Sequence, residues 1–214
     1  EYLAAYERAG AANVVVKGRD NETTFGLKVK NEEVAAFCKA QGGRYIGFAG
    51  VDPHKGITAI RELEFAVREL GLRGLNLQCF ELELAINDKR MYPLYAKCIE
   101  LDIPVNIHCG INFSTASLMD YGRPAYLDEV MQHFPELHIG IVSVRPKYLV
   151  KEDAGYRPLL AYGDGVLQDR IITGTGYPMQ PVAEAMEEFA ALPIKDKVKE
   201  KWLYGNAARF LGIA

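Results

Sequence analysis

The sequence predicts an α/β protein in which parallel strands alternate with helices, of the type that closes into a (β/α)8 barrel. Short apolar runs recur along the chain and alternate with longer amphipathic segments, which is the pattern of repeated βα units. The runs are apolar on both faces, as expected for strands in a sheet that helices cover on the outside. No segment has the composition of a linker, so residues 1–214 are expected to form a single barrel domain.

The first half of the chain gives a regular alternation. Residues 1–9 form an amphipathic helix that Gly10 ends, and the valine-rich run 13–16 forms a strand. A polar loop is expected over 17–30, followed by a helix to about residue 41 with Asn31 as its N-cap. Further strands are expected over 44–50, 72–77 and 104–108, and further helices over 57–70 and 91–101.

The second half continues the repeat with one interruption. A helix is expected over 124–134, strands over 137–144 and 171–175, and helices over 181–191, 196–203 and 205–211. The strand at 137–144 leads directly into Arg145 with no helix after it. A complete barrel needs about 250 residues. The predicted barrel therefore lacks its first strand and an internal segment near residue 138.

Composition excludes several classes of function. The net charge of −3 and the absence of a basic tract argue against nucleic-acid binding. No apolar run approaches the roughly 20 residues of a membrane span, and residue 1 already begins a helix instead of a signal peptide. The four cysteines stand far apart, which indicates reduced thiols in a cytoplasmic protein, with Cys109 as buried filler.

His108 is the candidate catalytic residue. It ends the apolar run 103–108, and ligands bind at the carboxyl ends of strands in parallel α/β folds. Asn106 shares its face of the strand, because side chains alternate with a period of two. Asn76, at the end of the run 72–77, would orient a polar substrate in the same way. The alternative for His108 is a hydrogen-bonded core histidine.

Three basic residues and one tyrosine complete the candidate substrate site. Lys17 and Arg19 follow the strand at 13–16, and Arg145 follows the strand at 137–144. A cation at such a position would bind a carboxylate, although a solvated surface charge is an equal alternative for each. Tyr177 would wall the pocket or pack in the core.

The other histidines and one aspartate receive structural roles. His54 is expected to be a solvated loop residue, and Asp52 to form an Asx turn or cap the next helix. His133 and His138 lie at a helix-to-strand turn on the opposite face of the barrel and are interpreted as structural.

Several segments carry a family resemblance. They are RYIGFAGVDP at 44–53, LRGLNL at 72–77, IPVNIHCG at 103–110, LDEV at 127–130, GTGYPM at 174–179 and LYGNAARFLG at 203–212. In their order and spacing the chain resembles the amidohydrolase-related proteins that include aminocarboxymuconate-semialdehyde decarboxylase and the resorcylate decarboxylases.

The resemblance implies a TIM barrel with a divalent metal, zinc or manganese, at the carboxyl ends of its strands. Such enzymes carry a His-x-His pair on the first strand, a third histidine that His108 matches, a further histidine for acid–base chemistry, and an aspartate on the last strand. This sequence contains no His-x-His, and Gly176 stands at the aspartate position. The metal site is therefore expected to be degenerate, with His108 as a ligand only if further ligands lie outside this sequence. The alternative is that no metal binds.

Two classes of function follow from these observations. The first is an amidohydrolase-type hydrolase or non-oxidative decarboxylase acting on a small carboxylate-bearing substrate, aromatic or keto-acid. The second is a catalytically inactive barrel that serves as a ligand-binding or assembly subunit. The resemblance also implies a homodimer.

Overall fold

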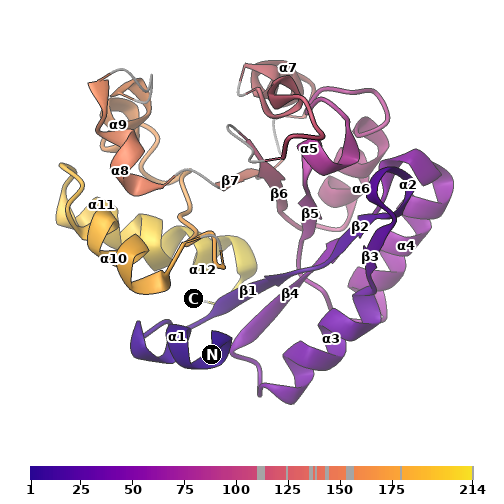
Figure 1. The fold of residues 1–214 in the computed structure, drawn as a ribbon, viewed down its shortest axis with the longest axis horizontal. Helices are drawn as coiled ribbons and strands as arrows, with labels where there is room; N and C mark the ends of the chain where they lie inside the picture. Colours follow the sequence, from indigo (N-terminus) through magenta and orange to yellow (C-terminus); the bar gives the residue numbers. More distant parts are fainter. Residues whose placement is uncertain are drawn as a thin grey trace. The chain divides into compact units, whose positions relative to one another are not determined.

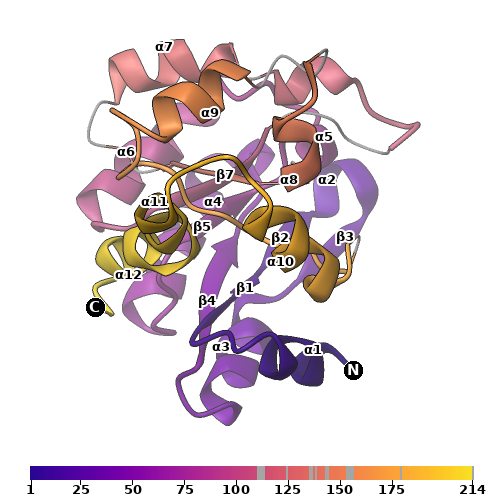
Figure 2. The same ribbon diagram turned by 90° about the vertical axis from the view of Figure 1, so that its left-hand side faces the viewer.

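The computed structural model describes residues 1–109, 114–123, 125–134, 137, 139–142, 145–152, 157–178 and 180–213. Contacts divide the chain into two compact units. One unit comprises Ala12–Ile139, and the other comprises Glu1–Ala11 together with Gly140–Ala214. We call them the sheet unit and the helical unit. Figures 1 and 2 show the ribbon coloured along the sequence.

The sheet unit is built on parallel strands that follow one another in chain order. The order in the sheet is β1-β4-β5-β6-β7, and the recorded pairings β1–β4, β4–β5 and β5–β6 are all parallel. A doubly wound sheet reverses its strand order at a switch point, whereas this order runs in one direction, as in a barrel. The sheet strands are β1 (Val14–Lys17), β4 (Tyr45–Gly50), β5 (Leu75–Leu77), β6 (Val105–His108) and β7 (Ile139–Val142), the last of which crosses the boundary between the units.

Helices cover one face of this sheet. The helix α3 packs on β1 and β4, and α4 packs on β4 and α6 (Figure 1). The core between sheet and helices holds Leu63, Leu75, Leu77, Val105 and Ile107, each fully buried. Burial of one such side chain contributes about 1.5–3 kcal/mol. The helices of this unit are α2 (Glu22–Phe25), α3 (Asn31–Ala40), η1 (Pro53–Lys55), α4 (Ile57–Arg68), α5 (Cys79–Leu82), α6 (Tyr92–Glu100), η2 (Met119–Gly122) and α7 (Tyr126–His133).

The prediction of a polar loop over 17–30 is wrong. This segment contains an antiparallel hairpin of β2 (Arg19–Asn21) and β3 (Leu27–Val29), with α2 between the strands. Charge pairs stabilise it, because the buried Asp20 binds Lys28 at 2.9 Å and Lys55 at 2.8 Å. Burial alone would raise the pKa of Asp20, but the hydrogen bonds from the two lysines hold it below its usual range. Ionic pairing of this kind leaves no apolar periodicity in the sequence.

Asn31 is not the N-cap that the sequence predicted. Lys30 precedes the first residue of α3, and its N–H donates to Glu33 Oε2. The buried Asn31 instead clamps the end of β4: its Oδ1 accepts from Gly50 N at 2.9 Å and its Nδ2 donates to Gly50 O at 3.1 Å. As an N-cap, the Asn31 side chain would accept a hydrogen bond from the first turn of its own helix. In the structure the same side chain joins α3 to β4.

The helical unit contains only helices and irregular segments among its described residues beyond β7. Its elements are α1 (Tyr2–Arg8), α8 (Pro146–Leu149), α9 (Arg157–Gly163), α10 (Val182–Ala190), α11 (Asp196–Glu200), a π-helical turn (Lys201–Gly205) and α12 (Asn206–Leu211). The last three form one uninterrupted helical run, so the expected break near residue 204 is absent. The helices α8 and α9 follow β7, where the sequence suggested none; Pro146 starts α8 at a position that suits proline.

The strand predicted over 171–175 is also wrong, because these residues form no strand. Their backbone groups are satisfied by the closing helical run instead. Thr173 N donates to Trp202 O at 3.1 Å, and Asn206 Nδ2 donates to Ile171 O at 2.7 Å. A segment whose backbone groups pair with a helix has fewer of them left for a neighbouring strand.

The other element predictions are confirmed to within a few residues at each end. The strand expected over 72–77 is shorter, and the strand expected over 137–144 is described over Ile139–Val142. Pro124 and His138 lie outside the described residues. None of the helices in the described part of the chain has the length and hydropathy that a membrane span requires.

Two glycines allow β1 and β4 to approach closely at their carboxyl ends. A Cβ atom on Gly18 would lie 2.6 Å from Gly50 N, and one on Gly50 would lie 2.3 Å from Arg19 N. Both partners are backbone atoms, so no side-chain rotation would relieve the overlap. The hairpin can therefore leave β1 at this point only because neither position carries a side chain.

We expect Gly50→Ala to destabilise the protein by about 3 kcal/mol, at the upper end of the usual cost of overpacking. The measurement is the free energy of unfolding from denaturant titration. The control is Gly205→Ala, because Gly205 has helical backbone angles and its Cβ would meet nothing closer than 3.9 Å. An equal effect of the two substitutions would contradict this account of the close approach.

Candidate functional site

The strand register places four of the predicted site residues on one face of the sheet. Lys17 pairs with Phe48, Gly50 pairs with Asn76, and Asn76 pairs with Asn106. Side chains two apart in a strand share a face, so Phe48 and Gly50 lie together and His108 lies with Asn106. We call this surface the inner face; it is opposite to the one that carries Leu75, Leu77 and Ile107.

A chain of amides joins the strands on the inner face. Asn76 Nδ2 donates to the backbone carbonyl of Gly18 at 3.0 Å. Asn76 Oδ1 accepts from Asn106 Nδ2 at 2.8 Å and from Gln78 Nε2 at 3.3 Å. We call Asn76, Gln78 and Asn106 the amide row. All three are buried, so their hydrogen bonds contribute to stability and fix the orientation of each amide.

His108 lies beside this row at the carboxyl end of β6. The residue is buried, and its imidazole lies against the ring of Phe80 with ring centroids 4.6 Å apart and an interplanar angle of 64°. Phe80 belongs to α5, which follows β5. Edge-to-face packing of this kind orients the imidazole. An oriented imidazole at the end of a strand is suited to acid–base chemistry.

Lys17 ends β1 and remains accessible to solvent. The surrounding protein atoms, and to a lesser extent the positive charge of Arg19, lower the pKa of Lys17 to about 8. A lysine with this pKa is still mostly protonated at pH 7. Within the described part of the inner face, Lys17 is therefore a cation at neutral pH.

The other two predicted cations are already paired. Arg19 lies 3.2 Å from Glu81, whose carboxylate also accepts from Asn21 Nδ2. Arg145, in the helical unit, binds Glu188 and lies 3.1 Å from Glu184 of α10. Each arginine thus has a structural partner that a substrate carboxylate would have to displace.

Tyr177 also belongs to the helical unit, in a cluster of aromatic residues. Its ring lies 5.3 Å from that of Tyr2 and 6.1 Å from that of Tyr6, whose hydroxyl is 2.7 Å from Thr175 Oγ1. The cluster attaches α1 to the segment before α10. The three rings are partly buried, so these contacts pack Tyr177 against α1 outside the described core clusters.

The remaining candidates have structural surroundings. Asp52 caps η1, as predicted, with Oδ1 accepting from His54 N at 3.0 Å. His54 is not a solvated loop residue, because its Nε2 lies 2.7 Å from Leu82 O and Arg90 approaches its Nδ1. His133 is exposed and stacks on Tyr92.

The cysteines of the described structure are free thiols, and Cys109 is buried as predicted. Burial raises the pKa of Cys109 to about 11, which keeps the thiol protonated at neutral pH. Because the thiolate is the reactive form, burial disfavours nucleophilic attack by Cys109.

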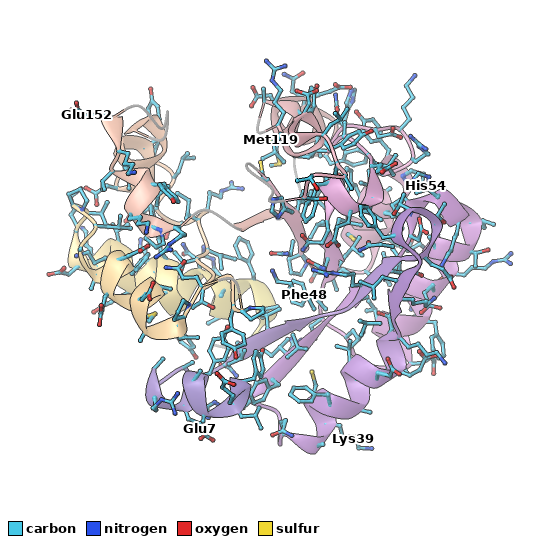
Figure 3. All side chains as sticks on the ribbon, viewed as in Figure 1. Glu7, Lys39, Phe48, His54, Met119 and Glu152 are labelled. Carbon is cyan, nitrogen blue, oxygen red and sulfur yellow. The ribbon has the colours of Figure 1, made fainter. Side chains whose placement is uncertain are left out.

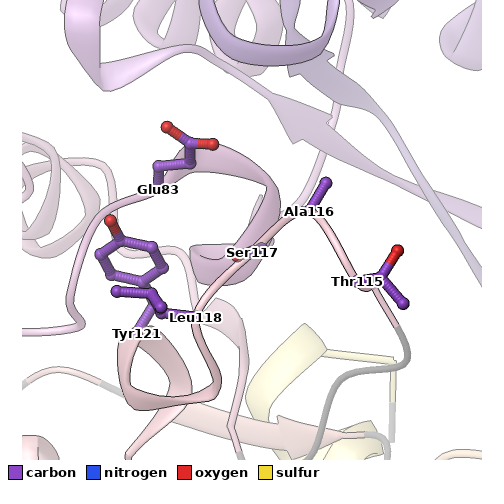
Figure 4. A pocket seen from close by; sticks show the side chains of 6 residues that line it. All are labelled: Glu83, Thr115, Ala116, Ser117, Leu118 and Tyr121. Carbon is purple, nitrogen blue, oxygen red and sulfur yellow. The ribbon is translucent and has the colours of Figure 1, made fainter.

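A separate pocket lies on the loops that follow β5 and β6. Its volume is about 310 Å³, and it is lined by Glu83, Thr115, Ala116, Ser117, Leu118 and Tyr121. In Figure 4, Glu83 and Tyr121 lie on one side of this pocket and Thr115 on the other. The Ser117 hydroxyl donates to the carbonyl of Phe80, which attaches this loop to the residue that packs on His108. Nothing in the sequence indicates this pocket, because its lining residues follow no spacing motif.

The described residues of the inner face offer few ligands to a divalent metal. The described neighbours of His108 on this face are carboxamides, and Lys17 lies three strands away on β1, whereas zinc and manganese require several imidazole, carboxylate or thiolate ligands. Within the described residues, no three His, Cys, Asp or Glu side chains lie close enough to hold an ion. Gly176 has φ of +68°, a left-handed conformation that an aspartate would adopt only with strain.

Comparison with solved structures identifies the fold. An uncharacterised TIM-barrel protein from Bordetella bronchiseptica matches with a TM-score of 0.83 and 28% identity, over 99% of this chain and 82% of that one. A 5-carboxyvanillate decarboxylase from Sphingomonas paucimobilis matches with a TM-score of 0.71 and 19% identity, over 99% and 82% of the two chains. A dihydroxybenzoic acid decarboxylase from a Polaromonas species, with bound manganese and an inhibitor, matches with a TM-score of 0.68 and 17% identity, over 99% and 85%.

These structures confirm the predicted α/β class with a partial TIM-type barrel. Comparison with curated proteins gives no match. The family model described as amidohydrolase matches residues 2–161, which is well over half of the sequence. The chain therefore belongs to the amidohydrolase family, as the resemblance of its segments predicted.

Proposed function

We propose that this protein is an enzyme that acts on a small carboxylate-bearing substrate, aromatic or keto-acid, by hydrolysis or non-oxidative decarboxylation. The observation that carries the proposal is that His108 and Lys17 share the inner face at the carboxyl ends of singly wound parallel strands. Catalytic residues of TIM barrels come from this edge. The decarboxylases with the same fold support the choice of a carboxylate substrate.

In a decarboxylation, Lys17 would bind the carboxylate and Asn106 would orient a polar substituent. The bond between the substrate carbon and the carboxyl carbon breaks, carbon dioxide leaves, and the electron pair stays on the substrate carbon. His108 in its protonated form would supply the proton that this carbon takes up. The reaction needs no oxidant or reductant, and a positioned general acid of this kind contributes about 10²- to 10⁴-fold in rate.

In a hydrolysis, the neutral imidazole of His108 would accept a proton from the attacking water. The same binding residues would serve, because Lys17 again pairs with an anionic group. The choice between the two reactions depends on whether water reaches the substrate carbon beside His108.

A divalent metal is supported for the family but less clearly for this chain. The manganese of the Polaromonas enzyme supports a divalent metal, zinc or manganese, at the level of the family. Because the donor set on the inner face does not fit one, we propose a degenerate metal site and assign no step to it. A homodimer in the cytoplasm, with residues 1–214 as one barrel domain, completes the proposal.

Gly176 favours a second candidate function. A left-handed glycine at the position where the family carries its aspartate removes one group that such enzymes use. A barrel that binds a ligand or a partner without turnover would retain the same scaffold and the same amide row.

We expect His108→Gln to lower turnover of a carboxylate substrate by about 10²- to 10⁴-fold with the fold retained. The assay follows carbon dioxide release or hydrolysis across a panel that includes 2,6-dihydroxybenzoate and 5-carboxyvanillate, and thermal melting checks folding. The matched control is His133→Gln, which changes an exposed histidine and should leave turnover unchanged. Full activity of His108→Gln would contradict its catalytic role, and absence of turnover in the unaltered protein would favour the binding subunit.

We expect Lys17→Met to be more stable than the unaltered protein at pH 7. The pKa of Lys17 is lowered from 10.5 to about 8 in the folded protein, so folding disfavours its charged form. The resulting loss of folding free energy is fully present below about pH 8. It disappears as the pH rises towards 10.5, where Lys17 also loses its proton in the unfolded chain. The measurement is the free energy of unfolding of both proteins at pH 7, 9 and 10.5, and a difference that does not shrink with pH would contradict the shift.

A further inference from the structure

We propose that the inner face binds a carboxylate through Lys17 without a divalent metal. The inference rests on the proposed function, because it names the group that recognises the substrate anion. It departs from the manganese of the related decarboxylase, since the donor set described above does not fit that ion.

Lys17 differs from the charged residues around it at the carboxyl edge of the sheet, because those residues are paired. Within the described residues, Lys17 has no carboxylate within ion-pair distance, although it ends a strand and is accessible. The acidic groups nearest in sequence are Asp20 and Glu22, and both are already paired, since Lys28 and Lys55 bind Asp20 and Lys55 also binds Glu22. The hairpin thus leaves one cation at this edge available for an anion from solution.

The main chain beside Lys17 is held by hydrogen bonds before any ligand binds. Gly18 N donates to Phe48 O at 2.7 Å, and Gly18 O accepts from Asn76 Nδ2 at 3.0 Å. The close approach to Gly50 prevents a sideways shift. A cation on a fixed main chain loses less conformational entropy on binding than one on a mobile loop.

The orientation of each amide in the amide row is fixed, and none of the amides carries a charge. The carbonyl of Gly18 can only accept a hydrogen bond, so it forces Asn76 to present its NH₂ group there and its oxygen to Asn106 and Gln78. Each member of the row is neutral. The row therefore brings no carboxylate to the inner face that would hold a metal or repel an anion, and the positive charge of Lys17 attracts an anion without competition from the row.

The test is benzoate binding by the full chain after dialysis against EDTA, measured by isothermal titration calorimetry at pH 7 with and without added Mn²⁺. We expect the same affinity in both conditions. Lys17→Met should weaken binding about tenfold or more, which is the usual value of a charge-assisted hydrogen bond, whereas Lys17→Arg should retain most of it.

The matched control is Lys39→Met, which removes the same charge from the exposed end of α3. Helices of βα units run antiparallel to their strands, so this end lies away from the carboxyl edge. Figure 3 shows Lys39 and His54, which follows β4, at opposite ends of the sheet unit. Lys39→Met should bind benzoate like the unaltered protein, and thermal melting of every variant checks folding.

Three results would overturn the inference: no benzoate binding at millimolar concentration, binding only when Mn²⁺ is present, or equal affinity for the Lys17→Met and unaltered proteins. The inference and the proposed enzyme fail separately. Benzoate binding that depends on Lys17, without turnover of any substrate, would contradict the proposed enzyme and support the anion site. Turnover that depends on a metal would support the enzyme and contradict metal-free binding.

Discussion

The close contact between Gly18 and Gly50 is the constraint on which the sheet unit depends. Two strands meet there with no room for a side chain. The side-chain amides of Asn31 and Asn76 hold the contact from two sides by hydrogen bonds to the backbone of Gly50 and Gly18. The hairpin departs from β1 at the same point. A local steric requirement thus determines both where β1 ends and where Lys17 is placed.

Buried amides on the inner face stabilise the sheet by joining its strands. Asn76 joins β1 to β5 through the Gly18 carbonyl and joins β5 to β6 through Asn106. Buried amides are tolerated only when they are hydrogen-bonded, and each one here is bonded to another amide or to the backbone. The same bonds that stabilise the sheet also orient the polar groups that a ligand at the carboxyl edge would meet.

The electrostatics of the site differ from those of a metal centre. Aligned carboxylates and imidazoles attract a divalent cation, whereas one ammonium, one imidazole and a row of amides favour an anion. A charged ammonium with a lowered pKa costs folding free energy, and binding of an anion would recover part of that cost.

The sequence by itself determined the class of fold, the order of its main elements and the position of His108 at a strand end. Periodicity and chain order carry this information, because a buried strand or an amphipathic helix needs only its own residues to be visible. Tertiary structure decided the rest. It turned the polar segment 17–30 into a hairpin through Asp20 and its lysines, and it left 171–175 without strand pairing because Trp202 and Asn206 satisfy its backbone.

The site divides in the same way. Lys17, Asn76, Asn106 and His108 follow from strand ends, so the sequence could place them at one edge of the sheet, whereas the strand register decided that they share a face. That Arg19 and Arg145 are paired with Glu81, Glu184 and Glu188, while Lys17 has no such partner in the described structure, depends on side chains 39 to 62 residues away in the sequence. Coulombic pairing acts through space, and only the folded chain decides which charges it brings within reach of one another.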